Sequence, residues 1–383
     1  MAQDPASVLL QDLEDEVAYI LTLQKTNGAF VDGPGSNMIN PYRNNAAAMS
    51  LLQGTKPELA AVAGYLGWYF GHINEGSGYS SLDLAGSIYD YIDDGLPSDK
   101  SAHNYDSADS YAATFLSLCL QYAKKGGDAE ILDQNRQSLK SVVSAMEGLL
   151  DQWLTWDKPY FWKVKYLMDN CEVHKGFKDA AVLFRTYLND TAAADKYDLE
   201  ARMIRDAIQG QLRKPDNSQY YWVKGWLRWP RAVNWKIWYP DSVSQIYPIL
   251  FQVIYPYDPI AIRLFENLHE QHRGWSDFNY AAAHSEKFKA GSNASVYPWC
   301  LVGYVSALMD QVYQDDERAR ENNIRRTRDF YTNVKTKIIE RSHEYFRVNN
   351  TAVCWTIEES AWYVCMLSQI MQNGWTDTVA WSA

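Results

Sequence analysis

Two kinds of helical segment alternate along the chain. The first kind is amphipathic: apolar residues recur at the helical period, and the opposite polar face must meet water. Its members are residues 8–24, 56–73, 133–154, 194–212, 258–272 and 316–340. The second kind is apolar or small nearly all round, which indicates burial on most sides. Its members are residues 44–52, 109–122, 172–184, 242–254, 294–309 and 358–371.

One buried and one exposed helix form a pair that recurs about every 60 residues. A single pair cannot bury its apolar face alone, and six such pairs close most simply into two concentric rings. The sequence therefore predicts an all-α fold: a single (α/α)6 toroid of six helical hairpins over residues 1–383, with an inner and an outer ring of helices.

The connections differ between the two ends of this toroid. Links from an inner to an outer helix are short and carry ordinary start signals, a capping box at Thr55–Glu58 and a cap at Asp258 followed by Pro259. Links from an outer to an inner helix are long and rich in aromatic and acidic residues. They span residues 27–43, 76–105, 155–170, 217–241, 274–293 and 344–355. A toroid gathers them at one end, here called the mouth, and long loops on a rigid scaffold are where binding sites normally lie.

Acidic residues cluster near the predicted starts of the inner helices, where their side chains would face the central cavity. They are Asp32, Asp106, Asp109, Asp169, Glu172, Asp241, Asp277, Glu358 and Glu359. The compact motifs among them are YDSADSYAA, KYLMDNCEVHKG and WYPDSVSQ. A purely structural role is open for each: Asp169 and Glu172 also read as a D-x-x-E capping box, and Asp241 stands at a helix start. A cap is worth about 1 kcal/mol of stability, whereas a general acid or base contributes about 10²–10⁴ in rate.

Cleavage of a glycosidic bond gives a reason for two acids at this place. One protonated carboxyl donates to the leaving oxygen, and an ionised carboxylate activates water or attacks the sugar. Asp109 and Asp169 would begin neighbouring inner helices, with axes about 8–10 Å apart. Burial beside Tyr166 would raise the pKa of Asp169, so we expect Asp169 to be the proton donor and Asp109 the base. Asp106, Glu172 and Asp241 are the further catalytic candidates, and the two roles of the pair could be exchanged.

At these residues the whole chain resembles the six-hairpin glycoside hydrolases, the (α/α)6-barrel superfamily. Asp109 in ADSYAATF is similar to the aspartate that opens the second inner helix in several of those families, and KYLMDNCEV is similar to the I-x-D-N-M-M-N motif of unsaturated glucuronyl hydrolases. The resemblance implies a glycosidase in which Asp169 is the proton donor. Ala108 stands where an H-D-x-G-F pattern has histidine, and Glu172 with His174 replaces the methionine–asparagine run. The resemblance therefore does not extend to an unsaturated-uronide substrate.

Aromatic residues are abundant, at 14% of the chain with 15 Trp and 27 Tyr. The tryptophans of the mouth loops are Trp162, Trp222, Trp226, Trp229, Trp235, Trp238, Trp275 and Trp355. Long polar loops do not carry so many indoles without a reason, and the apolar faces of sugars stack on such rings. The candidate substrate-binding residues are Asp32, Tyr42, Tyr105, Trp162, Tyr166, Trp229, Trp235, Tyr239, Trp275, Trp299 and Trp355.

Composition narrows the classes of partner. The net charge of −11 argues against nucleic acid, because neutralising phosphates needs a basic surface. No run of about 20 uncharged apolar residues is present, so no membrane span is expected. The five cysteines form no C-x-x-C pair, which indicates free thiols, and neither a metal nor another cofactor is expected. The expected partner is an oligo- or polysaccharide. The first residues, MAQDPAS, lack an apolar signal core, so the protein is either cytoplasmic or an extracellular protein whose leader has been removed.

Three rival functions stay open on sequence alone. A polysaccharide lyase or sugar epimerase on the same toroid would need a histidine or tyrosine base, and His103 and His174 lie beside the acidic motifs. A terpene-type cyclase would need acidic motifs, to which YIDDG at 91–95 is similar only in part. A glycan-binding toroid without catalysis would keep the aromatic rings while one acid was inert.

Overall fold

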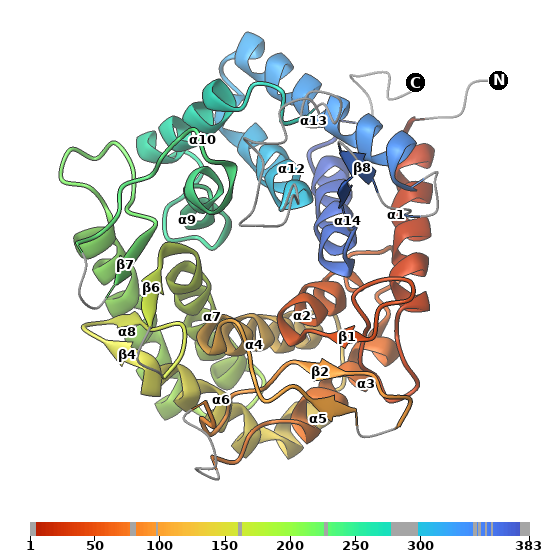
Figure 1. The fold of residues 1–383 in the computed structure, drawn as a ribbon, viewed down its shortest axis with the longest axis vertical. Helices are drawn as coiled ribbons and strands as arrows, with labels where there is room; N and C mark the ends of the chain where they lie inside the picture. Colours follow the sequence, from red (N-terminus) through yellow and green to blue (C-terminus); the bar gives the residue numbers. More distant parts are fainter. Residues whose placement is uncertain are drawn as a thin grey trace.

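The computed structural model describes residues 5–76, 82–96, 99–159, 163–225, 229–276, 298–339, 343, 346–348, 351–353 and 355–375. The helices around the centre are α2 (Pro41–Ser50), α4 (Ala108–Lys124), α7 (Leu167–Thr186), α9 (Tyr247–Leu250), α12 (Trp299–Leu308) and α14 (Ile357–Gln372). Outside them lie α1 (Pro5–Thr22), α3 (Leu59–Gly71), α6 (Arg136–Leu149), α8 (Thr191–Ala207), α10 (Pro259–Gln271) and α13 (Glu317–Lys337). The predicted all-α fold is confirmed, and Figure 1 shows its helices arranged as an inner and an outer ring.

The inner ring is held together by direct contact between neighbouring helices. Helix α4 packs against α2 and α7, and α14 packs against α2 and α12. A Cβ atom at Gly176 on α7 would lie 2.6 Å from the Cα atom of Ala113 on α4, and one at Gly303 on α12 would lie 2.7 Å from the ring of Phe330. Glycine at these positions therefore lets helix backbones approach more closely than any side chain allows.

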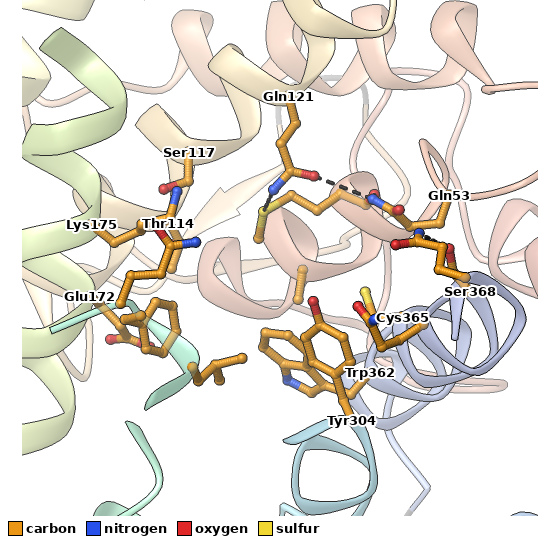
Figure 2. A pocket seen from close by; sticks show the side chains of 17 residues that line it. Gln53, Thr114, Ser117, Gln121, Glu172, Lys175, Tyr304, Trp362, Cys365 and Ser368 are labelled. Carbon is orange, nitrogen blue, oxygen red and sulfur yellow. Dashed lines mark hydrogen bonds between the residues drawn. The ribbon is translucent and has the colours of Figure 1, made fainter. Parts of the chain in front are cut away.

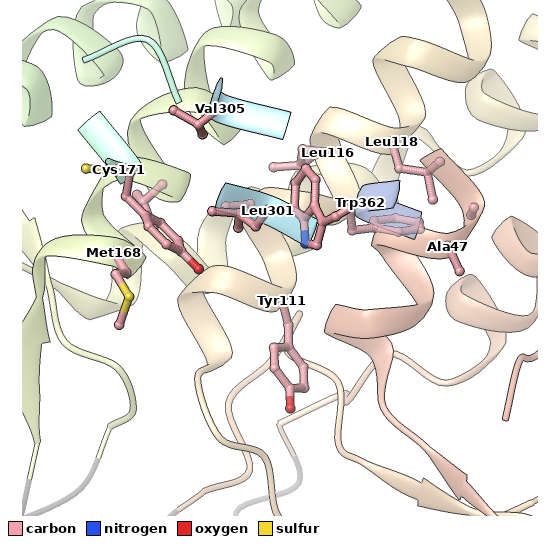
Figure 3. Packing of buried hydrophobic residues seen from close by; sticks show 14 of the residues in the cluster. Ala47, Tyr111, Leu116, Leu118, Met168, Cys171, Leu301, Val305 and Trp362 are labelled. Atoms are coloured by element: carbon pink, nitrogen blue, oxygen red, sulfur yellow. The ribbon is translucent and has the colours of Figure 1, made fainter. Parts of the chain in front are cut away.

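The core extends from one end of the chain to the other. A single cluster of buried hydrophobic residues runs from Leu9 to Trp375. Figure 3 shows part of it, with Ala47, Leu116, Leu118, Cys171, Leu301 and Val305 contributed by four helices of the inner ring. Cys119, Cys171, Cys300 and Cys365 are free thiols. No helix in the described part of the chain has both the length and the apolar character that crossing a membrane requires.

The first and last helical pairs of the ring are joined. Helix α1 packs against α14. Asp12 on α1 accepts a hydrogen bond from the hydroxyl of Tyr331 and forms an ion pair of 2.8 Å with Lys335, both on α13. These contacts connect residues that are more than 300 positions apart in sequence.

Short strand pairs occupy the long connections that lead to inner helices. The pairs are β1 (Met38–Ile39) with β2 (Tyr91–Ile92) and β3 (Lys100–Ser101), β4 (Leu150–Asp151) with β5 (Leu154–Thr155), β6 (Val164–Tyr166) with β7 (Val223–Gly225), and β8 (Phe346–Val348) with β9 (Thr351–Val353). All are antiparallel, and β6 pairs with β7 in the register Val164 to Gly225. This ladder ties the loop that precedes α7 to the loop that follows α8.

Two predicted helices have different bounds in the structure. Helix α6 ends at Leu149 instead of 154, because the chain reverses through Gln152 and Trp153, which have φ of 52° and 63°. The predicted inner helix 242–254 is interrupted: the turn η2 (Trp238–Ser242), which has a non-helical backbone at Tyr239, ends where the helix was predicted to begin, and the four-residue α9 follows. Gln252, with a φ of 60°, adopts a conformation that ends helical structure.

The two predicted helix starts at short links are also modified. The Thr55 hydroxyl donates to Glu14 instead of closing a capping box, and Glu58, the N-cap of α3, makes no side-chain capping bond. Asp258 is the N-cap of α10 and Pro259 its first residue, as predicted. The Asp258 carboxylate, however, accepts from the amide of Tyr255 rather than from the first turn of the helix.

Candidate active site

The first turns of α4 and α7 bring two buried aspartates together. Asp109 lies in the first turn of α4, whose N-cap is Ser107, and Asp169 lies in the first turn of α7. The Ser107 hydroxyl lies 2.7 Å from Oδ1 of Asp109 and 2.6 Å from Oδ2 of Asp169. One side chain at a helix start therefore connects the two acids that the sequence predicts to be catalytic.

Neither aspartate acts as the predicted helix cap. Tyr166 is the N-cap of α7, and no side chain supplies a capping bond there, so the D-x-x-E pattern of Asp169 and Glu172 does not form a capping box. The Asp109 carboxylate does accept an amide hydrogen bond, of 3.0 Å, but from the adjacent Ser110. Their positions at helix N-termini still favour negative charge on this pair of side chains.

The hydrogen bonds around the pair indicate where a proton resides. Asp109 also accepts a 2.6 Å hydrogen bond from the Thr155 hydroxyl, in addition to the Ser110 amide. A serine hydroxyl carries one hydrogen, so Ser107 cannot donate to both acids at once. Because Asp109 already has two other donors, the arrangement that satisfies every contact has Asp169 protonated and donating to Ser107, which in turn donates to an ionised Asp109.

The pKa values of the pair follow the same order. Burial raises the pKa of Asp109, and the hydrogen bonds from Thr155 and Ser107 oppose that rise. Burial raises the pKa of Asp169 much further, and the negative charges of Asp109 and Glu172 add to the effect. Two like charges that share a site cannot both ionise easily, so the proton remains on the acid with fewer donors.

A cavity of about 160 Å³, called the mouth cavity below, opens beside this pair. It is lined by Asn40, Tyr42, Arg43, Asp106, Ser107, Ser110, Tyr111, Met168, Asp169, Glu172, Tyr239 and Tyr247. Asp169 contributes to the lining, whereas Asp109 is fully buried and does not. The two acids are therefore not equivalent: Asp169 is open to the mouth cavity, whereas Asp109 is buried and contacts Ser107.

Glu172 lines the mouth cavity and is itself buried. The Tyr42 hydroxyl donates a 2.6 Å hydrogen bond to Oε1 of Glu172. Burial raises the pKa of Glu172 to about 8, against the hydrogen bonds from Ser110 and Tyr42 that lower it. Glu172 is therefore largely uncharged at neutral pH. Asp106, in contrast, is exposed at the edge of the same cavity.

The other predicted acids have partners of their own. Asp32 forms an ion pair with Arg43, whose Nε lies 3.7 Å from Glu358. Asp241 accepts a 2.7 Å hydrogen bond from the amide of Asn234 and so holds the preceding loop. Asp277 lies outside the described residues.

Glu359 has a structural position on the opposite side of the ring. Its two carboxylate oxygens accept from the amides of Trp299 and Cys300, at 2.8 and 2.7 Å. Glu359 on α14 therefore satisfies the first amides of α12, a capping bond supplied by a neighbouring helix.

The predicted substrate-binding aromatic residues fall into two groups. Tyr42 and Tyr239 line the mouth cavity, and Tyr166 stacks on Trp222 in the loop beside it. The tyrosine and tryptophans with buried rings are Tyr105, Trp275, Trp299 and Trp355. Two further tryptophans belong to neither group: Trp235 donates a hydrogen bond to Gln219, and Trp229 is 91% exposed. Trp162 lies outside the described residues.

The buried rings are fixed by hydrogen bonds. Tyr105 donates to the carbonyl of Leu82, Trp275 to Nδ1 of His269, and Trp355 to Ser360. None of these three rings is among the described residues that line the mouth cavity. Their hydrogen bonds instead connect mouth loops and helix ends to the scaffold.

Several residues near the site were not identified from the sequence. Ser107 and Thr155 flank predicted elements and touch the acids. Tyr111 and Asn40 both contact Asp90, at 2.9 and 3.0 Å. The signal available for Ser107 is its position two residues before Asp109, where a serine is a common N-cap.

Comparisons with solved structures find proteins of similar fold. A solved wild-type glycosidase matches with a TM-score of 0.66 at 12% identity, over 97% of this chain and 99% of the other. A glycosidase in complex with glucose matches with a TM-score of 0.63 over the same shares, also at 12% identity. A rhamnosidase from Klebsiella oxytoca with rhamnose bound matches with a TM-score of 0.59 at 14% identity, over 98% of this chain and 65% of the other.

What these likenesses define is the class of fold: the chain shares the helical architecture of these solved structures. No family model and no curated protein matches the sequence.

Proposed function

We propose that the protein is a glycoside hydrolase in which Asp169 is the general acid. The observation that carries this proposal is the Ser107 hydroxyl, which lies 2.7 Å from Asp109 and 2.6 Å from Asp169 at the edge of the mouth cavity. A general acid that works near neutral pH needs a raised pKa and access to the leaving oxygen. Asp169 has both, since burial raises its pKa and it lines the cavity.

In this proposal Asp109 keeps Asp169 protonated until substrate is bound. The sequence alone favoured Asp109 as the base, but its full burial and three hydrogen-bond donors support a different role. An ionised Asp109 raises the pKa of Asp169 by like-charge repulsion and fixes it through Ser107. Asp109 is thus a positioning residue that acts through Asp169.

The second reacting carboxylate in this proposal is Asp106. It is exposed at the cavity edge, where a water molecule can reach it. As the bond between the anomeric carbon and the leaving oxygen breaks, the Asp169 proton moves to that oxygen. The water oxygen bonds to the anomeric carbon, and its proton moves to Asp106. Exchange with solvent then restores the Asp169 proton and removes the one on Asp106.

The charges around the mouth cavity favour a neutral sugar. Asp106, Asp169 and Glu172 line the cavity, and the cation among the lining residues, Arg43, is already paired with Asp32. A uronate would bring its negative charge close to the Asp106 carboxylate and to the single negative charge that the Asp109–Asp169 pair carries, which is unfavourable at short range. The volume of 160 Å³ is below the range of about 300–1,000 Å³ for drug-sized ligands, which supports binding of one sugar ring.

The rival lyase or epimerase reaction has less support. His174 is buried, its Nδ1 lies 2.9 Å from the carbonyl of Ala201, and burial lowers its pKa to about 4. His103 is exposed, and neither histidine is among the residues that line the mouth cavity. Neither His103 nor His174 is therefore placed to abstract a proton from a uronate in the mouth cavity.

A panel of neutral aryl glycosides and oligosaccharides tests the proposal, with new reducing ends as the readout. We expect hydrolysis by the wild-type protein and its loss in Asp169→Asn. Absorbance near 235 nm, which an unsaturated product of a lyase would give, should stay flat. Binding of glycans with no hydrolysis of any of them would instead identify a non-catalytic glycan-binding protein.

A further inference from the structure

A second and larger cavity lies at the end of the inner ring opposite the mouth. Its volume is about 320 Å³, and it is called the far-end cavity below. The mouth cavity is lined by the first turns of the inner helices, whereas this one is lined by later turns: Gln53 follows α2, and Ser117 and Gln121 lie on α4. Glu172 is the residue that lines both. The far-end cavity is therefore a separate space within the same ring.

One wall of the far-end cavity is polar but uncharged. Figure 2 shows Gln121, Ser117 and Thr114 projecting from α4 toward it. Gln53 and Gln121 are joined by a contact of 3.4 Å, and the Gln121 amide nitrogen lies 3.2 Å from the sulfur of Met49. Such long bonds and a thioether acceptor satisfy an amide poorly. Both amides therefore keep hydrogen-bonding capacity for a bound molecule.

The opposite wall is aromatic. The rings of Tyr304 on α12 and Trp362 on α14 stack, with centroids 5.9 Å apart and planes inclined by 22°. Figure 2 shows these rings across the cavity from Gln121 and Ser117. An aromatic face opposite amides and hydroxyls suits a molecule with an apolar face and a rim of hydroxyl groups.

The acid and the lysine that line the far-end cavity, Glu172 and Lys175, both have partners. Lys175 forms an ion pair with Asp179, one turn further along α7. Glu172 accepts from Tyr42. A ligand therefore meets no unpaired charge from these two residues, which favours an uncharged molecule over an anion or a cation.

We propose that the far-end cavity is a second, non-catalytic binding site for an uncharged monosaccharide or polyol. Protein interiors are close-packed, and a polar space of this size is filled by water or by a ligand. At 320 Å³ it reaches the range of about 300–1,000 Å³ that is typical of ligand sites. The ligand places its apolar face on Trp362 and Tyr304 and its hydroxyls on Gln53 and Gln121. The site does not require that the mouth cavity be catalytic.

Two serines on the same face of α4 provide a matched pair of variants. Ser110 and Ser117 are seven residues apart, two helical turns or about 10.5 Å, and both are buried. Ser110 lines the mouth cavity and Ser117 the far-end cavity. Ser117→Leu fills the far-end cavity and Ser110→Leu fills the mouth cavity, with the same added volume on the same helix.

The experiment measures binding of D-glucose and myo-inositol by saturation-transfer NMR and calorimetry, with glucuronate and glucose 6-phosphate as charged comparators. We expect binding of at least one neutral probe to persist in Ser110→Leu and to weaken at least tenfold in Ser117→Leu. Gln121→Leu, which adds no bulk and lies toward the end of α4, should weaken it in the same direction. Hydrolysis, if present, should persist in Ser117→Leu.

The result that overturns the proposal is equally definite. If neither neutral probe binds Ser110→Leu, or if Gln121→Leu and a folded Ser117→Leu bind them within twofold of the wild-type protein, the far-end cavity holds water only. Tighter binding of the charged comparators would refute the uncharged class. Failure of Asp169→Asn to alter hydrolysis would refute the proposed function and leave this proposal intact.

Discussion

The Ser107 hydroxyl and the Asp169 carboxylate are 2.6 Å apart, and this contact joins the N-terminus of one inner helix to the first turn of the next. Through it, a helix cap becomes part of an acid–base chain that ends at Asp109. This series of hydrogen bonds explains how the Asp169 carboxyl group, which lines the mouth cavity, can hold its proton. The expected effects of the substitutions below follow from these contacts.

Asp169→Asn should reduce kcat by about 10²–10⁴, the contribution of a positioned general acid. The asparagine amide can still donate to Ser107 in place of the Asp169 proton, so the fold should be retained and the melting temperature should change little. The measurement is kcat on the best aryl glycoside of the panel. Substrates with very acidic leaving groups need less proton donation and should lose less activity. Equal loss on good and poor leaving groups would contradict the role of Asp169 as acid.

Asp109→Asn should move the alkaline limb of the pH profile of kcat/KM to lower pH. An acid catalyst loses activity as pH rises through its pKa, and the charge of Asp109 raises the pKa of Asp169. Removing that charge should lower the pKa of Asp169 by about one unit or more. A uniform loss at every pH, with the limb unmoved, would show that Asp109 does not act through the pKa of Asp169.

Ser107→Ala tests whether the hydroxyl transmits this effect. Without it the two carboxyl groups lose their shared partner, and we expect kcat to fall with little change in KM, together with a shifted alkaline limb. Ser107→Thr keeps the hydroxyl and should recover most of the activity. If alanine and threonine variants behave alike, the Ser107 hydroxyl does not transmit the effect, and Ser107 serves only as the N-cap residue of α4, where its side chain makes no capping bond.

Glu172→Gln should alter the pH dependence of stability. Burial raises the pKa of Glu172 from 4.5 to about 8, so between those pH values the folded protein binds a proton that the unfolded chain releases. The free energy of unfolding therefore falls as pH rises through this window, by at most about 1.4 kcal/mol per unit. The glutamine variant should lose this part of the slope and gain stability relative to wild type at pH 8. Urea unfolding at pH 5 and pH 8 measures the difference.

Gly176→Ala should destabilise the ring, because its Cβ atom would lie 2.6 Å from the backbone of Ala113 on α4. Separating α4 from α7 costs about 1–3 kcal/mol by overpacking and also lengthens the contact between Ser107 and Asp169. Gly67→Ala on α3 is the matched control, since its Cβ atom would meet nothing within 4 Å and should stabilise by about 0.5–1 kcal/mol. Equal effects of the two substitutions on urea midpoints would contradict this view of the α4–α7 contact.

The alternation of buried and exposed helices was readable from the sequence because burial on all sides leaves a distinct apolar pattern. The end of α6 was not, since the apolar pattern continues past Leu149 into β4 and β5. The turn there depends on the positive φ of Gln152 and Trp153, for which neither residue gives a local signal. Boundaries set by backbone conformation are thus less visible than faces set by burial.

The sequence motifs name the candidate acids, but they do not reveal the different surroundings of the two. Asp109 and Asp169 have similar surroundings in sequence, and only the packing of α4 on α7 decides that one lines a cavity and the other lies behind Ser107. The indoles show a related limit. Trp238 and Trp275 fall in predicted loops, yet both are buried, because a loop sequence does not reveal which of its faces packs on the scaffold.

The joint between Asp12 of α1 and Lys335 of α13 has a consequence for how the chain is made. Because α1 finds these polar partners more than 300 positions later, a nascent polypeptide has to keep α1 without them until that later stretch has been synthesised. A circular permutant that begins at one of the short inner-to-outer links and joins the present ends of the chain would bring these partners closer together in sequence. We expect such a permutant to refold faster.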